Sequence, residues 1–172
     1  MPFEQLNLQY LQNLLLQYNH SYFHSVLRYG ILFWGNSPIC RDIFRIQKRA
    51  MRITTSKGRR ESCRELFKEL KILTLPSQYI HLVLVFVMKN RGLFIPNNDI
   101  HDHNTRHNLD FHLPTTHLSI VQRMYSGFKI FKSLPTHLKI HIDNPRHFKK
   151  KTNKYLMEHS FYKLEKYYQR TS

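Results

Sequence analysis

Apolar residues recur at intervals of three and four over much of this 172-residue chain. Residues 3–18 are rich in Leu and Gln, and their apolar positions share one side of a helix. Residues 22–34 form a second apolar stretch, with one face carrying Phe23, Val26, Leu27, Gly30 and Ile31. The run Gly35-Asn36-Ser37-Pro38 that follows is a turn signal. The pattern therefore predicts two helices before residue 35.

Residues 39–53 give the clearest helical pattern in the chain. One side carries Ile39, Ile43, Ile46, Ala50 and Ile53, and the other side is mostly basic. We expect the isoleucine side to be buried and the basic side to face solvent. Aromatic residues around Trp34 lie among Leu and Ile, which favours core packing over base stacking. The predicted core contacts join Trp34, Phe33, Ile43, Ile46 and Leu66.

Shorter signals organise the middle of the chain. Ser62 and Glu65 have the spacing of a capping box, which predicts a short helix bearing Leu66, Phe67 and Leu70. Pro76 suits the first turn of a further helix. Residues 77–91 are nearly all apolar, and their β-branched residues leave a strand as the alternative. Their length and lack of turn signals favour a buried helix.

The last third of the chain also reads as helical. Residues 96–117 look irregular and contain several histidines, and residues 119–133 then resume a helical pattern. Asn144-Pro145 resembles an N-cap with Pro at the first helical position, leading into residues 146–157. A final short helix would carry Phe161, Leu164 and Tyr168. The predicted fold class is all-α, an irregular helical bundle of about 6–8 helices with a loop-rich, His-containing middle segment.

Charge narrows the possible partners. The net charge is +16, from 27 basic and 11 acidic residues, which predicts attraction to polyanions. Residues 41–71 hold eleven basic and four acidic residues, and residues 123–172 hold twelve and three. The apolar runs are too short to cross a bilayer, so no membrane span is expected, although charge alone would allow binding to anionic lipid. No secretory signal peptide is recognisable.

The chain carries no motif that indicates catalysis. No two aspartates are adjacent, and the P-loop, H-E-x-x-H and G-x-S-x-G patterns are missing from the sequence. Two-metal phosphoryl transfer needs converging carboxylates, so no catalytic residue is assigned and no cofactor is expected. The histidines at 101, 103, 107, 112 and 117 match no standard zinc spacing. A polar, solvated loop is the favoured interpretation of that segment, over a metal site.

A basic surface on the 39–53 helix is the best candidate site. Few acidic residues lie one turn away to form ion pairs, and further basic residues follow the helix directly. Such a cluster favours phosphate contacts, which give affinity without sequence information. An ordinary solvated helix face is the alternative. The candidate nucleic-acid-binding residues are Arg45, Lys48, Arg49, Arg52, Lys57, Arg59 and Arg60. A second candidate is Lys149-Lys150-Lys151 with Lys154, for which a solvated terminal helix is equally plausible.

Several strings in a fixed order resemble one protein family. The family is that of jockey-like non-LTR retrotransposon reverse transcriptases. Its successive signatures are similar to residues 22–31, 34–37, 43–53, 62–67, 72–75 and 79–80. The series continues with His101 and Thr105-Arg106, then Tyr125 to Phe131, Ser133-Leu134-Pro135, Phe148-Lys149 and Phe161-Tyr162. Each string is weak alone, but their order and spacing make the match fairly specific over residues 20–165.

The resemblance implies a position within that family's polymerase. The stretch looks like the thumb and the region after it, with residues 1–20 as a poorly matching N-terminal helix, 21–95 as a thumb-like domain and 96–172 as a post-thumb region. The family's catalytic Tyr-x-Asp-Asp motif would lie upstream, so no family catalytic residue can be carried over. A polymerase thumb tracks the backbone of the template–product duplex, which would give the basic helix a role.

These observations lead to one functional hypothesis and two alternatives. The chain is expected to be a fragment of a mobile-element RNA-directed DNA polymerase, not an enzyme on its own, that binds RNA or RNA–DNA hybrid through phosphate contacts. The alternatives are a host-recruited helical module that binds protein through apolar faces left by the missing palm, and a non-functional remnant. The missing palm, or another protein, is the protein partner considered for an apolar face. The resemblance implies an intracellular location, nuclear or cytoplasmic.

Overall fold

The computed structural model describes residues 30–58, 60–91 and 119–170, and within these ranges the chain is helical and contains no strand. After a helical stretch at residues 30–34, the elements follow in the order α3 (Ile39–Thr54), α4 (Arg64–Glu69), α5 (Leu75–Lys89), α6 (Ser119–Lys132), α7 (Thr136–Lys139), α8 (Pro145–His159) and α9 (Leu164–Arg170). The predicted all-α bundle is confirmed. The predicted helix at 3–18 and the His-rich segment lie outside the described residues.

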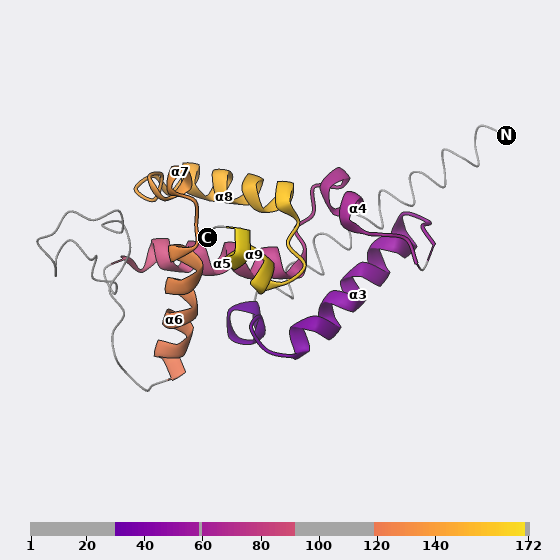
Figure 1. Ribbon diagram of the computed structural model, residues 1–172, viewed down its shortest axis with the longest axis horizontal. Helices are drawn as coiled ribbons and strands as arrows, with labels where there is room; N and C mark the ends of the chain where they lie inside the picture. Colours follow the sequence, from indigo (N-terminus) through magenta and orange to yellow (C-terminus); the bar gives the residue numbers. More distant parts are fainter. Residues whose placement is uncertain (1–29, 59, 92–118, 171–172) are drawn as a thin grey trace, which may run out of the picture.

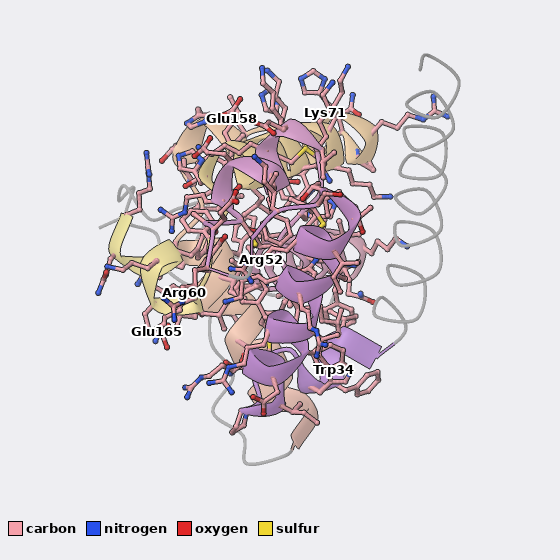
Figure 2. All side chains as sticks on the ribbon, turned by 90° about the vertical axis from the view of Figure 1, so that its right-hand side faces the viewer. Trp34, Arg52, Arg60, Lys71, Glu158 and Glu165 are labelled. Carbon is pink, nitrogen blue, oxygen red and sulfur yellow. The ribbon has the colours of Figure 1, made fainter. Side chains whose placement is uncertain are left out.

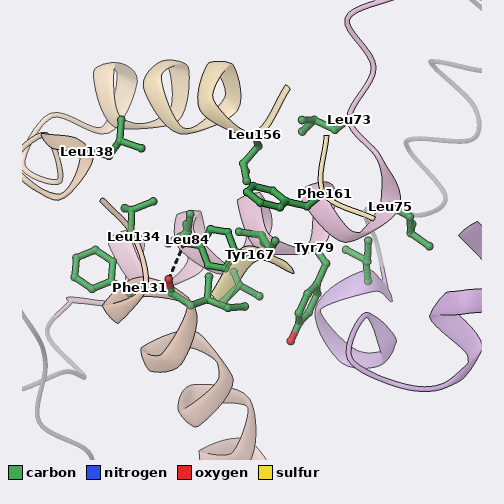
Figure 3. Close-up of a cluster of buried hydrophobic side chains, with 14 of the residues drawn as sticks. Leu73, Leu75, Tyr79, Leu84, Phe131, Leu134, Leu138, Leu156, Phe161 and Tyr167 are labelled. Carbon is green, nitrogen blue, oxygen red and sulfur yellow. Dashed lines mark hydrogen bonds between the residues drawn. The ribbon is translucent and has the colours of Figure 1, made fainter. Parts of the chain in front are cut away.

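Helix α5 is the centre of the fold, as Figure 1 shows: α6 and α8 pack against it, and α3 contacts its first half. Its apolar sequence is explained by this position, because a helix covered on several sides needs apolar residues around most of its circumference. Figure 3 shows the core that results, with side chains from α5, α6, α8 and the C-terminal segment. The fully buried members include Leu84, Phe131, Phe148, Leu156 and Tyr167.

Two helix starts carry side-chain caps; Pro76 in the first turn of α5 and the Asn144 cap of α8 were predicted, and the Thr74 cap was not. Thr74 is the N-cap of α5, its Oγ1 accepts a hydrogen bond from the Ser77 amide, and Pro76 lies in the first turn. Asn144 is the N-cap of α8, and its Oδ1 accepts from the His147 amide at 3.1 Å. Because residues 75–89 form a continuous helix, the strand alternative for this segment is excluded.

The predicted capping box before α4 is wrong. The helix begins at Arg64 with Cys63 as the N-cap, and no side chain caps it. Glu65 pairs with Lys68 at 3.2 Å instead of reaching back toward Ser62. The physical reason is the burial of Cys63, whose Sγ lies 3.6 Å from the Lys48 carbonyl oxygen. This contact fixes the start of the helix one residue later than the sequence suggests.

The predicted turn before α3 is confirmed, and Gly35 is essential to it. A Cβ built on Gly35 would lie 2.2 Å from Cδ2 of Tyr79 and 2.5 Å from the Ile31 carbonyl. No other residue fits this approach of the chain to α5. Ser37 completes the turn, because both its amide and its hydroxyl donate to the Trp34 carbonyl. The turn thereby sets where α3 starts relative to α5.

The predicted orientation of α3 is wrong. The helix buries Phe44, Gln47, Met51 and Thr54, whereas the isoleucines at 39, 46 and 53 are 55, 58 and 68% exposed. The buried side lies about a third of a turn from the isoleucine side, at 100° per residue. Phe44 packs against Phe67 of α4 and Tyr162, and Met51 is buried in the same core. Shape at the core therefore outweighs the number of apolar residues on the other side.

The predicted core around Trp34 is therefore largely wrong as well. Only Leu66 of the five expected residues is buried, while Trp34 and Ile43 are half-buried at the edge of the core. Phe33 is 66% exposed and Ile46 faces away. For Ile43 and Ile46 the cause is again the rotation of α3 about its axis. Phe33 and Trp34 belong to the helical stretch before the turn.

Described residues from both predicted main regions contribute to one core. Ile80 and Leu84 come from the first region, and Ile130 and Leu156 from the second. The division of the chain near residue 95 stays a prediction. In the described ranges, every helix is too short or too polar to cross a membrane.

Candidate nucleic-acid interface

Helix α3 has three distinct sides. One side is buried, one carries the exposed isoleucines, and the third carries Arg41, Arg45, Lys48, Arg49 and Arg52. The spacing of these five residues keeps them on one side over the length of the helix. We call the four predicted residues Arg45, Lys48, Arg49 and Arg52 the basic surface of α3. Figure 2 labels Arg52 of this surface and Arg60 of the following loop.

Arg45 and Arg49 are the residues of this surface most available to a ligand. Both are exposed, and Arg45 has one acidic neighbour, Asp42, whose Oδ1 lies 2.8 Å from its Nη1. An exposed pair of this kind contributes little to stability, so a phosphate can compete for the guanidinium. Arg49 makes no ion pair with any described residue.

Lys48, in contrast to Arg45 and Arg49, makes cation–π contacts with two aromatic rings. Its Nζ lies 4.9 Å from the Phe44 ring centre and 5.7 Å from that of Tyr162. Tyr162 packs edge-on against Phe44 at 4.9 Å, and Arg64 of α4 covers its ring at 4.9 Å. The C-terminal segment thus joins α3 and α4 through one tyrosine. Lys48 has a structural role there, and its charge still adds to the field of the surface.

Arg52 also has an internal partner. Its Nε donates to the Glu61 carbonyl at 2.9 Å and ties the end of α3 to the loop before α4. Glu61 turns its carboxylate toward the same loop, accepting from the Gly58 amide and lying 3.7 Å from Lys57 Nζ. Lys57 is therefore partly neutralised. The loop is ordered by contacts to the basic surface and not only by the backbone.

The structure brings six of the seven predicted residues to one region of the molecule. Arg60 is exposed on the loop beyond Arg52, and Arg59 lies outside the described residues. The side chains with the fewest contacts to the rest of the protein, and so the most available to a ligand, are Arg45, Arg49 and Arg60. The other three, Lys48, Arg52 and Lys57, also hold the local structure together.

Sequence reasoning missed Gln47, which fixes the helix beneath this surface. Its Nε2 donates to the Leu73 carbonyl at 3.1 Å, and its Oε1 accepts from the Leu75 amide at 2.9 Å. A buried amide that satisfies two backbone groups in this way locks α3 to the start of α5. Phe44, Gln47 and Met51 also have helical spacing in the sequence. Because Gln47 is polar, their pattern is a weaker signal of burial than the isoleucine pattern.

Arg64 was likewise missed, since a lone arginine in a basic region gives no pattern of its own. Only its position over Tyr162 shows that it belongs with the basic surface. The ring and the flanking cations Lys48 and Arg64 come from three segments distant in the chain. No spacing rule in the sequence could have joined them.

Among the described residues, no reactive cysteine and no metal-binding group lies beside this surface. Burial raises the pKa of both thiols, Cys40 and Cys63, and the charges of Arg52 and Lys48 offset only part of that rise for Cys63. Both are therefore protonated at neutral pH and are poor nucleophiles. No three metal-ligating side chains converge within residues 30–58, 60–91 and 119–170.

The second predicted cluster lies elsewhere. Lys149, Lys150, Lys151 and Lys154 belong to α8, and Lys154 approaches Glu158 at 3.8 Å. In Figure 1 the first turns of α8 lie beside α7, at the end of the molecule away from α3. The two basic clusters are thus separate surfaces.

Comparisons of this chain with protein-family models, with curated proteins and with solved structures find no match.

Proposed function

We propose that this chain is the thumb and post-thumb part of a jockey-like non-LTR retrotransposon reverse transcriptase, and that it binds an RNA–DNA hybrid without sequence preference. The proposal rests on the ordered strings from Tyr22 to Tyr162 that resemble the family, together with one structural observation. That observation is the exposure of Arg45, Arg49 and Arg60 on a side of the molecule that the core does not use.

The geometry suits backbone contacts better than base readout. Arg45 and Arg49 lie one helical turn apart on a straight surface, and guanidinium groups bind phosphate oxygens through paired donors. Each phosphate that such a group neutralises releases counterions from the duplex. Affinity should therefore depend steeply on salt and weakly on base sequence.

The experiment is a salt titration of binding to a short RNA–DNA hybrid at pH 7.5, followed by fluorescence anisotropy. We expect the triple variant Arg45→Gln/Arg49→Gln/Arg60→Gln to flatten the slope of log K against log salt by about 2–3, at 0.7–0.9 per contact. Arg52 and Lys48 are left intact, because their internal contacts would confound the result.

The matched control removes the same charge elsewhere. Lys89, Lys132 and Lys166 are exposed and form no ion pair with a described residue. The triple variant with Gln at these positions should keep most of the wild-type slope. Equal flattening in both variants would mean that only net charge matters, and would reject α3 as the interface.

The chain alone should not synthesise DNA. Its sequence contains no adjacent aspartates to hold two metal ions. Primer extension with purified chain, Mg²⁺ and dNTPs should give no product above that of a mock purification. Template-dependent incorporation would contradict this part of the proposal.

A second candidate function, a protein-interaction module, is favoured by the exposed isoleucines of α3. Ile39, Ile46 and Ile53 repeat every seven residues, with Ile43 and Ala50 between them, which is the spacing of an a/d seam. Basic residues flank this seam. A partner helix with apolar a and d positions and acidic flanks would complement it in shape and charge.

A designed peptide tests this candidate. A helix with Leu or Ile at a and d and Glu at e and g should bind the wild-type chain, and Ile46→Gln/Ile53→Gln should abolish binding without lowering the melting temperature. If the peptide binds the variant equally well, its attraction is electrostatic only and the seam has no role.

A further inference from the structure

Three histidines gather where α7 turns into α8. His141 lies in the turn, His147 in the first turns of α8, and their ring centres are 4.7 Å apart. His137 comes from α7, and Lys151 lies one helical turn beyond His147. Both are close enough to His141 to affect its protonation. We call these four residues the histidine cluster.

The cluster opposes its own protonation. Burial lowers the pKa of His141 first, and the positive charges of His147, Lys151 and His137 lower it further. The folded pKa is thus below the unfolded value near 6.5, so protonation of this group destabilises the fold as pH falls below that value. An anion placed among the rings would reverse this effect, because it would stabilise the charged forms.

The surrounding groups supply cations but almost no compensating anion. Asp143, two residues after His141, is engaged by Arg91 at the end of α5. The first turn of α8 contains no acidic residue, although a helix N-terminus favours one. In the described part of the chain, none of the four cluster residues forms an ion pair. Arg146 and Lys150 add exposed charge to the same end of α8.

A metal ion is a poor fit for this arrangement. The described residues contain no group of three ligating side chains that converge on one point. A lysine at the edge of the rings would also repel a cation. The same residues match side-chain donors that bind phosphate, which are imidazolium and ammonium groups.

We propose that the histidine cluster is a second phosphate-binding surface for nucleic acid, and that its affinity for phosphate rises as pH falls from 7.5 to 5.5. The inference rests on the proposed function in that the ligand is the same phosphodiester backbone. It adds a site at the opposite end of the molecule from α3 and makes binding there depend on proton uptake (Figure 1).

The test measures binding of the full chain to the same RNA–DNA hybrid at pH 7.5 and pH 5.5. If the cluster gains phosphate contacts at the lower pH, the salt slope should steepen by up to about 2 and affinity at 0.1 M salt should rise at least tenfold. The variant His137→Gln/His141→Gln/His147→Gln should keep the pH 7.5 affinity and lose most of the change at pH 5.5.

A matched control accounts for the other histidines, since the chain has twelve. The variant His101→Gln/His103→Gln/His107→Gln removes the same number outside the cluster and should keep the full pH response. Circular dichroism at pH 5.5 checks that every variant remains folded. If the cluster variant keeps the pH response, or the control loses it, the inference is overturned.

The outcomes separate this inference from the proposed function. Binding that depends on Arg45, Arg49 and Arg60 but not on pH would overturn the histidine cluster and leave the α3 interface standing. Binding seen only at pH 5.5, and lost in the cluster variant, would support the cluster and reject α3. Absence of binding at both pH values would reject both.

Discussion

Helices α5 and α3 are nearly equal in length, yet α5 buries eleven of its 15 residues and α3 buries four of its 16. Helix α5 is enclosed by α3, α6 and α8, whereas α3 meets the core along one narrow side. A helix enclosed in this way presents little surface to a ligand. Helix α3 leaves two further sides exposed for ligands, one basic and one apolar. Only a few of its side chains therefore hold it to the core.

The attachment of α3 also uses a different kind of contact. Helix α5 is packed by apolar side chains such as Ile80 and Leu84. Helix α3 relies on Gln47, whose two hydrogen bonds to the backbone around Leu73 and Leu75 specify one register. Apolar packing tolerates small rotations, but a paired buried amide does not. The polar contact thus determines which side of α3 faces the core and which sides remain exposed.

The largest expected effect lies on the α5 side of this comparison. Leu84→Ala should lower the free energy of unfolding by about 3–5 kcal/mol, because it removes a fully buried side chain and leaves a cavity. Denaturant unfolding measures the loss. The matched change Leu82→Ala, on the half-buried side of the same helix, should cost clearly less. Equal losses would mean that α5 is not central to the core.

A smaller loss is expected at the junction of the two helices. Gln47→Met keeps the side-chain volume but leaves the Leu73 carbonyl and the Leu75 amide unpaired, which should cost about 2–3 kcal/mol. The control Gln169→Met, on an exposed position of α9, should change stability by less than about 0.5 kcal/mol. A neutral Gln47→Met would show that α3 is positioned by Phe44 and Met51 alone.

The alkaline pH dependence should come from the core around α5. Tyr167 is buried and donates to the Ile130 carbonyl at 2.8 Å, and burial raises its pKa well above 10. Burial also raises the pKa of Tyr168 to about 12. Stability from both groups is present below pH 10 and is lost as pH rises through 10 toward 12, because the unfolded state ionises first.

The corresponding variant is Tyr167→Phe. It should lose about 1 kcal/mol at pH 8 and show a smaller further loss between pH 10 and 12 than the wild type. Melting temperatures over that range provide the measurement. An unchanged alkaline slope in both Tyr167→Phe and Tyr168→Phe would assign the dependence to other groups.

The smallest effect is expected on the exposed side of α3. Ile46→Gln should change the free energy of unfolding by less than about 0.5 kcal/mol, since the side chain is 58% exposed. Thermal unfolding of the single variant checks this. A loss above 2 kcal/mol would show that the isoleucine seam is covered in the folded chain, and the contrast between α3 and α5 would disappear.

Local signals in the sequence located most of the described elements. The spacing of residues 39–53, the position of Pro76 and the Asn144 cap all depend on neighbours within one turn, so they could be predicted. Helix α7 was not anticipated, because four residues are too few to show a period. The capping box at Ser62 failed because its competitor, the buried Cys63, gains its contact from α3.

The candidate site divides in the same way. The basic composition of residues 41–60 and the placement of Arg45 and Arg49 on one helix follow from sequence spacing. The roles of Lys48, Arg52 and Arg64 do not, because their partners Tyr162 and Glu61 come from other segments. The histidine cluster also needed the structure, since it joins α7, a turn and α8.

By itself the sequence determined the helices, the charge and the two basic regions, because periodicity, capping and composition act over a few residues. The tertiary structure decided the rotation of α3, and with it which of three sides is buried. The isoleucine side is the most apolar, yet the buried residues are Phe44, Gln47 and Met51, with Phe44 against Phe67 of α4 and Gln47 bonded to the start of α5. Burial depends on the shape and hydrogen bonds of the partner surface, and a single helix carries no information about that surface.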